Sequence, residues 1–175
     1  MVASHQSDVA TVKVLLAAGA DVSIRDPDES SSASTLAAQF GQTGMMKALL
    51  EHGVDANDGG EGRWSSLHWA ALFNSAGCVA VLLDGGADIN ARSRGNDRHT
   101  AFHFAAEAGK NEALLVLLGR GANVNETTDN ASTALHLAHE MHGDDVGETV
   151  DVLLRWGASE QTVDEDGKTS LDLFE

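Results

Sequence analysis

The residues best suited to chemistry in this sequence are its histidines, and three of them fall in one short segment. The run His136-Leu137-Ala138-His139-Glu140-Met141-His142 brings three imidazoles and one carboxylate close together along the chain. A zinc-protease helix needs the order H-E-x-x-H, which puts two imidazoles one turn apart on one face, whereas the order here is H-E-x-H. No set of spaced Cys or His residues completes a site. We therefore expect neither a metal nor another cofactor.

Two further features suggest chemistry but favour structural roles. The single cysteine, Cys78, lies on an apolar stripe with Val79 and Leu82, where a thiol behaves as a small buried hydrophobe. The glycine-rich segment Asp58–Gly62 lacks the Lys and Ser/Thr of a phosphate-binding loop and carries acids that repel phosphate. No catalytic serine motif or carboxylate pair is evident, so we expect a protein without catalytic activity.

Composition narrows the class of protein. The 175 residues include 27 acidic and 11 basic side chains, giving a formal net charge of −16. A charge of this sign repels nucleic-acid phosphates and anionic lipid surfaces. The sequence shows no transmembrane segment and no secretion signal, and one cysteine cannot form an internal disulfide. We expect a monomer of one domain inside the cell, cytoplasmic or nuclear, with no nucleic-acid or membrane partner.

The elements that position these residues are repeated along the chain. A Leu-rich stretch followed by Gly-Ala and a polar residue occurs five times, with glycines roughly 33 to 36 residues apart, a period typical of helical repeat arrays. A unit of this kind cannot bury its apolar face alone, so the repeats must stack. The five copies are Leu15–Asp21, Leu49–Asp55, Leu82–Asp88, Leu117–Asn123 and Leu153–Ser159.

Each copy predicts two short helices and a stop. In the third copy, Ser65 is a suitable N-cap, and apolar residues recur at helical spacing both after it and again from Cys78 onward. Gly86 then supplies the left-handed conformation that ends the second helix at little steric cost. The same cap register holds Ser32, Ser65, Thr100, Thr133 and Thr169.

These letters resemble the ankyrin repeat, whose core reads T-P-L-H-x-A-A followed by L-L-x-x-G-A-D-V-N. The best match is Thr100-Ala101-Phe102-His103-Phe104-Ala105-Ala106, continued by Leu117–Asn125. The resemblance covers essentially the whole chain and implies an all-α ankyrin-repeat solenoid of stacked helix-turn-helix units joined by β-hairpin loops. It also implies that His68, His103 and His136 hydrogen-bond to hairpin backbone. Tetratricopeptide repeats share the period but lack the Gly-Ala-Asp hairpins.

The register divides residues 1–175, read as one ankyrin domain, into four full units and two partial ones. The full units are 32–64, 65–99, 100–132 and 133–168, and the partial ones are 1–31 and 169–175. Several departures weaken the pattern. Every unit lacks the proline after the cap, and Ser34 and Thr35 replace the expected Leu and His, so we predict weaker helix starts and looser packing of the second unit. In the fifth copy, an insertion between the helices and His139 in place of Ala make the packing hard to predict.

In an ankyrin stack the hairpins and first helices line a concave face that binds proteins, and the register assigns candidate contacts to that face. Apolar anchors are expected at the ends of the first helices and at one hairpin base, where large desolvated groups carry most of the binding energy. The alternative is that they fill gaps between units. The candidates are Phe40, Trp64, Leu72, Phe73 and Met141, together with Glu107. Trp69, taken to replace the signature Leu, is predicted to be buried core, and Trp156 is predicted to lie away from the groove.

The connection Asn90–His99 adds a basic element. It is slightly longer than its neighbours and holds Arg92, Arg94 and Arg98, with His99 at its end. Arginine forks suit carboxylates, so Arg94, Arg98 and His99 join the candidate contacts for an acidic or apolar peptide segment. Alternatively, the arginines neutralise Glu61, Asp88 and neighbouring acidic hairpins.

The sequence therefore predicts a noncatalytic protein-interaction module. One alternative is a targeting or regulatory domain of a larger protein that includes a catalytic part. Another alternative is that the chain is a substrate of an enzyme. The resemblance implies this because Asn57, Asn90 and Asn125 occupy the hairpin position that is hydroxylated in some ankyrin proteins. A self-assembling structural piece is the remaining alternative.

Overall fold

The computed structural model describes residues 8–25, 31–58, 64–94, 98–139 and 146–173, and its regular structure in these ranges is helical. In chain order the helices are α1 (Asp8–Ala17), α2 (Ala33–Gln39), α3 (Thr43–Glu51), α4 (Ser66–Leu72), α5 (Ala76–Asp84), α6 (Ala101–Glu107), α7 (Asn111–Gly119), α8 (Ala134–His139) and α9 (Val146–Arg155). The only β-structure among the described residues consists of two isolated antiparallel bridges, Thr127 with Thr133 and Val163 with Thr169.

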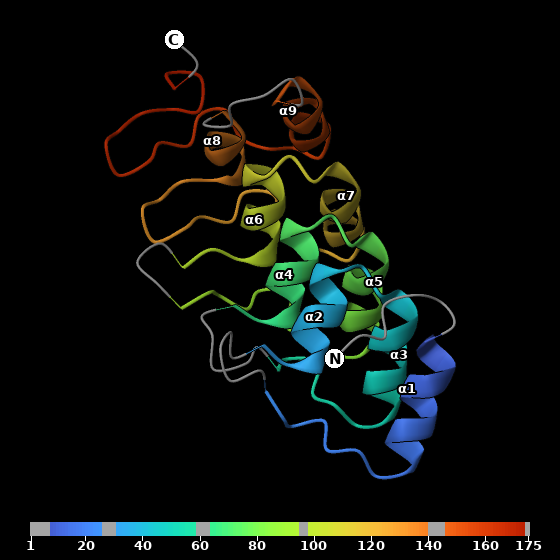
Figure 1. The fold of residues 1–175 in the computed structure, drawn as a ribbon. Helices are drawn as coiled ribbons and strands as arrows, with labels where there is room; N and C mark the ends of the chain where they lie inside the picture. Colours follow the sequence, from blue (N-terminus) through green and yellow to red (C-terminus); the bar gives the residue numbers. More distant parts are fainter. Residues whose placement is uncertain (1–7, 26–30, 59–63, 95–97, 140–145, 174–175) are drawn as a thin grey trace.

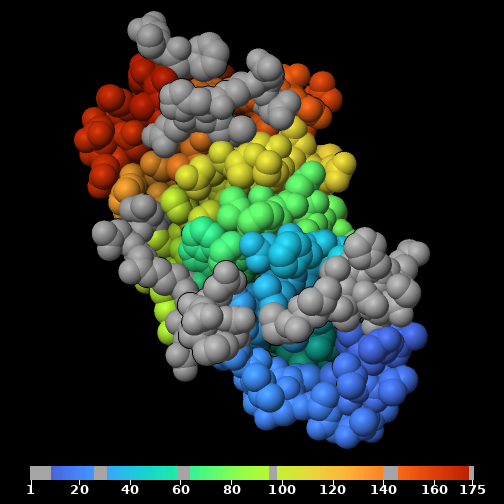
Figure 2. Space-filling model, viewed as in Figure 1, coloured from blue at the N-terminus to red at the C-terminus, as the bar shows by residue number. Residues whose placement is uncertain are grey.

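The helices form two layers that follow the chain from one end of the molecule to the other. Helices α2, α4, α6 and α8 pack side by side in one layer, and α1, α3, α5, α7 and α9 pack in the second (Figure 1). The loops between successive units project from the edge of the first layer. In the space-filling view the units appear as successive coloured bands (Figure 2). The predicted stack of helix pairs is therefore confirmed.

The core lies between the layers and continues from unit to unit. Leu67, Leu82, Leu114 and Leu135 are almost completely buried, and each belongs to a different helix. Paired alanines such as Ala70-Ala71 and Ala105-Ala106 are also inaccessible, and their small side chains let adjacent first helices approach closely. Because each unit buries its apolar residues against its neighbours, stability depends on contacts between adjacent repeats.

The predicted caps Ser32, Ser65 and Thr100 are present at α2, α4 and α6, whereas no helix of the described residues follows Thr169. Thr100 has extended backbone and its hydroxyl accepts the backbone N–H of His103, which satisfies one of the free donors at the start of α6. Gly86, with φ of 90°, follows α5, and the N–H of Ala87 returns to the carbonyl of Leu82 at 2.9 Å. A side chain would be strained at this φ, which explains why glycine recurs at the end of each second helix.

The signature histidines connect each first helix to a hairpin, as the resemblance implied. His103 Nδ1 accepts the backbone N–H of Thr100 at 3.2 Å, and its Nε2–H donates to the carbonyl of Glu126 at 3.0 Å. His68 makes the same pair of bonds to Ser65 and Ala91. His136 repeats the arrangement with Thr133 and Lys168.

In the second unit, hydroxyl groups take the place of the signature histidine's imidazole. Thr35 Oγ1 accepts the backbone N–H of Ser32 at 2.8 Å, and the N–H of Thr35 donates to Ser32 Oγ at 3.2 Å. Ser34 and Thr35 are both buried, and Ser34 Oγ lies 2.8 Å from Ser32 Oγ. The helix start is thus hydrogen-bonded without histidine. Looser packing of this unit stays a prediction.

The fifth copy accommodates His139 through a polar contact. His139 is the last residue of α8, and its Nδ1–H donates to the carbonyl of Ser170 in the following partial unit. The insertion that follows lies at residues 140–145, outside the described residues, and so does the predicted contact Met141. Across the described part of the chain, the helices are all too short to traverse a lipid bilayer.

Candidate functional site

The surface formed by the hairpin loops and the outward sides of α2, α4, α6 and α8 is called here the hairpin face. Aromatic side chains gather on it around α4. Trp64 precedes α4 and contacts Trp69 with ring centroids 4.8 Å apart, and Trp69 stacks on Phe73 at 5.8 Å. Phe104 of α6 packs on Trp64 at 4.5 Å. We call Trp64, Trp69, Phe73 and Phe104 the aromatic stripe.

The aromatic stripe arises because two of its members occupy equivalent positions in successive repeats. Trp69 and Phe104 each follow a signature histidine, and Trp64 comes just before the N-cap of α4. Trp69 lies on α4 and Phe104 on α6, and these first helices pack side by side, so consecutive units bring the rings together. Trp64 and Trp69 are half-buried, Phe73 is 46% exposed and Phe104 is only 6% exposed. The stripe is therefore anchored in the fold at one end and open at the other.

One prediction about the stripe was wrong. Trp69 was expected in the core because it was assigned to the signature Leu, but Leu67 occupies that position and is 1% exposed. Trp69 lies two residues later, on the hairpin face. Phe104, which the prediction of contact residues missed, occupies the equivalent position one unit later. Comparing the residue after each signature histidine would have identified both.

Phe40 lies apart from the stripe but close to its exposed end. It follows α2, as Phe73 follows α4, and it is 64% exposed. Both phenylalanines line a shallow depression of about 450 Å³, together with Asn74 and Glu112. Leu72 is half-buried at the end of α4, and Glu107 is exposed at the end of α6. Phe40, Leu72 and Phe73 thus lie near the C-terminal ends of the first helices α2 and α4.

The opposite end of the stripe opens into a cleft among the hairpins. This hairpin cleft has a volume of about 640 Å³ and is lined by residues of the first three units, including Arg25, Asp58, Trp64, His68, Arg92 and Arg94. Arg25 Nη2 donates to Asp58 Oδ1 at 2.8 Å. Trp64 belongs to both features, so the cleft and the stripe form one continuous surface.

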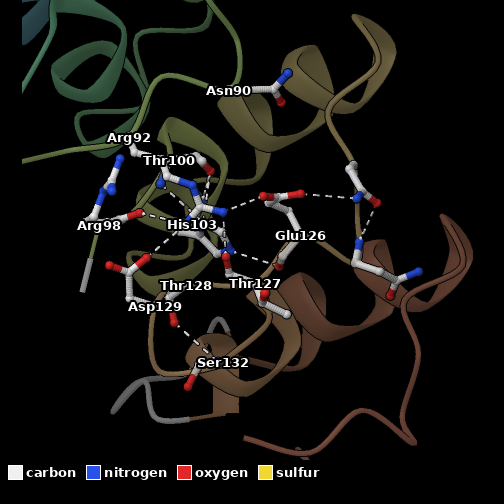
Figure 3. A network of polar contacts seen from close by, with 12 residues as sticks. Asn90, Arg92, Arg98, Thr100, His103, Glu126, Thr127, Thr128, Asp129 and Ser132 are labelled. Atoms are coloured by element: carbon white, nitrogen blue, oxygen red, sulfur yellow. Dashed lines mark hydrogen bonds and ion pairs between the residues drawn. The ribbon is translucent and has the colours of Figure 1, made fainter. Parts of the chain in front are cut away.

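Arg92 holds neighbouring hairpins together. Its guanidinium contacts Glu126 at 2.5 Å and Asp129 at 3.6 Å, and it donates to the carbonyl of Thr127 at 3.0 Å (Figure 3). The alternative prediction, that these arginines neutralise acidic hairpins, is confirmed for Arg92 with Glu126 and Asp129. For Asp88 it stays a prediction: its carboxylate accepts the backbone N–H of Asn90 and forms no salt bridge with a described residue. Glu61 lies outside the described residues.

The two predicted contact arginines, Arg94 and Arg98, do not form ion pairs like those of Arg92. Arg94 and Arg98 are exposed, and neither forms a salt bridge with another residue in the described ranges. Arg98 contributes its backbone carbonyl to Arg92 Nη1. Half-buried His99 packs on Phe104 with ring centroids 5.3 Å apart, which places it beside the stripe. Arg94 thus lines the hairpin cleft, and His99 lies beside the stripe.

Burial keeps His68 and His103 neutral. Desolvation lowers the pKa of His68 and of His103 to about 4, although the hairpin carbonyl that each ring contacts acts in the opposite direction. With Nδ1 accepting and Nε2–H donating, both ring nitrogens are occupied. These histidines therefore support the hairpins and are not available as ligands or bases.

Three other features concern the potential metal ligands, Cys78 and Trp156. Within the described residues, His, Cys, Asp and Glu side chains form no group of three that could hold a metal ion. Cys78 is buried, and desolvation raises the pKa of its thiol. Trp156 follows α9 in the second layer and is 48% exposed, away from the hairpin face as predicted.

The hairpin asparagines are not equivalent. Asn57 Nδ2 donates to the carbonyl of Gly86, and Asn57 Oδ1 accepts the N–H of Asp88, linking two hairpins. Asn125 makes the same bridge to Gly157 and Ser159. The side chain of Asn90 makes no such bond to a described residue. Among the three, only Asn90 leaves its amide open.

Comparison with known proteins agrees with this architecture. A family model for ankyrin repeats in three copies matches residues 1–93, and a second for ankyrin repeats in many copies matches residues 93–138. The chain belongs to the ankyrin repeat family, whose domains are protein–protein interaction modules. The predicted all-α ankyrin solenoid is confirmed.

The similar curated proteins are much longer than this chain. It is 35% identical over 86 residues to the E3 ubiquitin-protein ligase KEG of Arabidopsis thaliana, covering 49% of this chain and 5% of that protein. It is 35% identical over 142 residues to the nuclear factor NF-kappa-B p105 subunit of Gallus gallus, covering 78% of this chain and 14% of that protein. The chain thus corresponds to a small part of either relative.

Proposed function

We propose that this chain is a noncatalytic module that binds a protein partner through its hairpin face, which corresponds to the concave face of ankyrin stacks. The observation that carries the proposal is the aromatic stripe. Trp64, Trp69 and Phe73 form an unbroken array of contacting rings that is only partly covered by the fold. Aromatic groups that become desolvated at an interface centre typically supply most of the binding energy.

The exposure of the phenylalanines argues against a gap-filling role. Phe102, which fills space between units, is 2% exposed, whereas Phe73 and Phe40 are 46% and 64% exposed. Both follow the end of a first helix and lie over the depression that they line together. A partner that covered them would remove apolar surface from water, a gain of roughly 25 cal/mol per Å².

Two basic and two acidic side chains lie toward opposite ends of the first helices. Arg94 and Arg98 lie at the hairpin end, and Glu107 and Glu112 lie toward the opposite end of the first helices. A bound segment with an apolar centre and an acidic residue facing the hairpins matches this distribution. Leu72, His99 and Met141 complete the set of contacts we propose.

A second proposal concerns the protein context. The two similar proteins carry their matching regions within far longer chains, and one is named as an E3 ubiquitin-protein ligase. The module would then recruit or regulate through its hairpin face while chemistry takes place elsewhere in a larger protein. The charge of −16 supports a partner that is neither nucleic acid nor membrane, and we propose an intracellular monomer.

The test compares a pair of apolar residues on the aromatic stripe with a pair in the second layer. In Trp64→Ala with Phe73→Ala, we expect affinity for a captured partner to fall by about 30-fold, which corresponds to ~2 kcal/mol for a hot spot. The measurement is quantitative capture from the native source, followed by titration of the recovered partner against each purified variant.

The control pair is Leu115→Ala with Trp156→Ala, because these side chains are about as exposed as Phe73 but lie in the second layer. This pair should bind as tightly as wild type. If the control pair loses the partner and the stripe pair retains it, binding takes place on the second layer and the proposal is wrong.

A further inference from the structure

The hairpin cleft contains a guanidinium that the fold leaves incompletely paired. Arg25 Nη2 donates to Asp58, but Arg25 Nη1 is enclosed and has no hydrogen-bond acceptor among the residues that the structure describes. An enclosed donor without an acceptor raises the free energy of the folded state. An oxygen atom that accepted a hydrogen bond from Nη1 would relieve that cost. Asp58 does not supply it, because its hydrogen bond to Arg25 is with Nη2.

The remaining donors of the cleft can be assigned one by one. Arg92 is fully occupied by Glu126, Thr127 and Asp129 of the next hairpin. His68 is neutral, and both of its ring nitrogens are bonded to Ser65 and Ala91. Arg94 is exposed and has no ion pair in the described part of the chain. The two available cationic groups are therefore Arg94 and the unsatisfied side of Arg25.

The acids in the cleft limit what these two groups can bind. Asp55 and Asp58 also line it, and the chain as a whole carries a charge of −16. A polyanion would be repelled by these charges, whereas one carboxylate can be held by two guanidiniums through charge-assisted hydrogen bonds. The apolar side of the cleft is Trp64, which continues into the stripe.

We propose that the hairpin cleft binds an aspartate or glutamate side chain of the partner segment, with its carboxylate between Arg25 and Arg94 and an adjacent apolar residue on Trp64. This inference rests on the proposed function, because the same segment covers the aromatic stripe. Arg25 Nη1 is enclosed in the free protein, so its guanidinium must turn toward the cleft as the carboxylate enters.

The experiment uses a phage-displayed library of random dodecapeptides selected on the full chain. We expect enriched peptides to share an acidic residue close to an apolar one. One enriched peptide is then synthesised in three forms, with the original acid, with the matching amide, and with phosphoserine at that position. Affinities are measured by fluorescence polarisation for wild type, Arg94→Ala, Arg25→Met and the exposed control Arg155→Ala.

For wild type and Arg155→Ala, the amide should bind about tenfold more weakly than the acid, as expected for loss of a charge-assisted pair. In Arg94→Ala and Arg25→Met the acid and amide forms should bind almost equally. Because Arg94 is exposed, its variant keeps the test independent of any effect of Arg25→Met on folding.

Several results would overturn the carboxylate site: no enrichment, enriched peptides without an acid, an acid effect that persists in both arginine variants, or tighter binding of phosphoserine. Peptides that lose affinity in Trp64→Ala with Phe73→Ala but ignore the arginines would overturn this site and leave the proposed function intact. Peptides that ignore both sets of substitutions would contradict both proposals.

Discussion

Replacing His103 with alanine is expected to lower the free energy of unfolding by about 3 kcal/mol, a large share of the 5–15 kcal/mol typical of a domain. The ring is completely buried and bonds to the backbone N–H and hydroxyl of Thr100 and to the carbonyl of Glu126. Alanine leaves these polar groups without partners and leaves a cavity where the ring was. Urea denaturation followed by circular dichroism measures the change.

His52→Ala is the matched control, because His52 is exposed at the end of α3. Its free energy of unfolding should remain within about 0.5 kcal/mol of wild type, as is usual for surface substitutions. If His103→Ala were equally mild, the helix-to-hairpin bond would contribute little, and stability would rest on apolar packing between units alone.

Acidification from pH 7 to pH 5 is expected to remove about 4 kcal/mol of stability, about 2 kcal/mol from each of His68 and His103. Their pKa values fall from 6.5 to about 4 in the folded protein because burial disfavours the charged ring. The unfolded chain therefore binds more protons than the folded one between these values. Stability is greatest above the unfolded pKa and declines as the pH falls toward the folded pKa.

Urea denaturation at half-unit pH steps measures this slope. Asp21 and Asp172 do not contribute in this window, since hydrogen bonds from Ser23 and Thr169 lower their pKa below the ordinary 3.8. His103→Ala should lose about half of the pH dependence, and His52→Ala should keep all of it. A wild-type stability that is flat between pH 7 and pH 5 would show that the buried rings are protonated in the folded state.

The sequence was sufficient to predict the backbone of the stack, because the relevant signals are local. A hydroxyl residue caps each first helix, and Gly86 or Gly121 ends each second helix with positive φ. The role of His103 could also be predicted, since its partners are backbone groups at fixed register. Such features need only the chain's own spacing and the unit's repetition.

The candidate site was harder to predict, because it depends on contacts between units. Trp69 was placed in the core through an assignment two residues off register, and that error hid the ring that connects Trp64 to Phe73. The three arginines of one hairpin look alike in sequence. Only the position of the next hairpin shows that Arg92 is paired with Glu126 while Arg94 is not.

The central claim, that the hairpin face binds protein, is tested most directly by hydrogen exchange of the chain with and without its captured partner. We predict that binding slows amide exchange in residues 64–73 and 98–107, which carry the aromatic stripe together with Arg98 and His99. Exchange in α5, α7 and α9 should be unchanged. Protection confined to those second-layer helices, with none in α4 or α6, would contradict the claim.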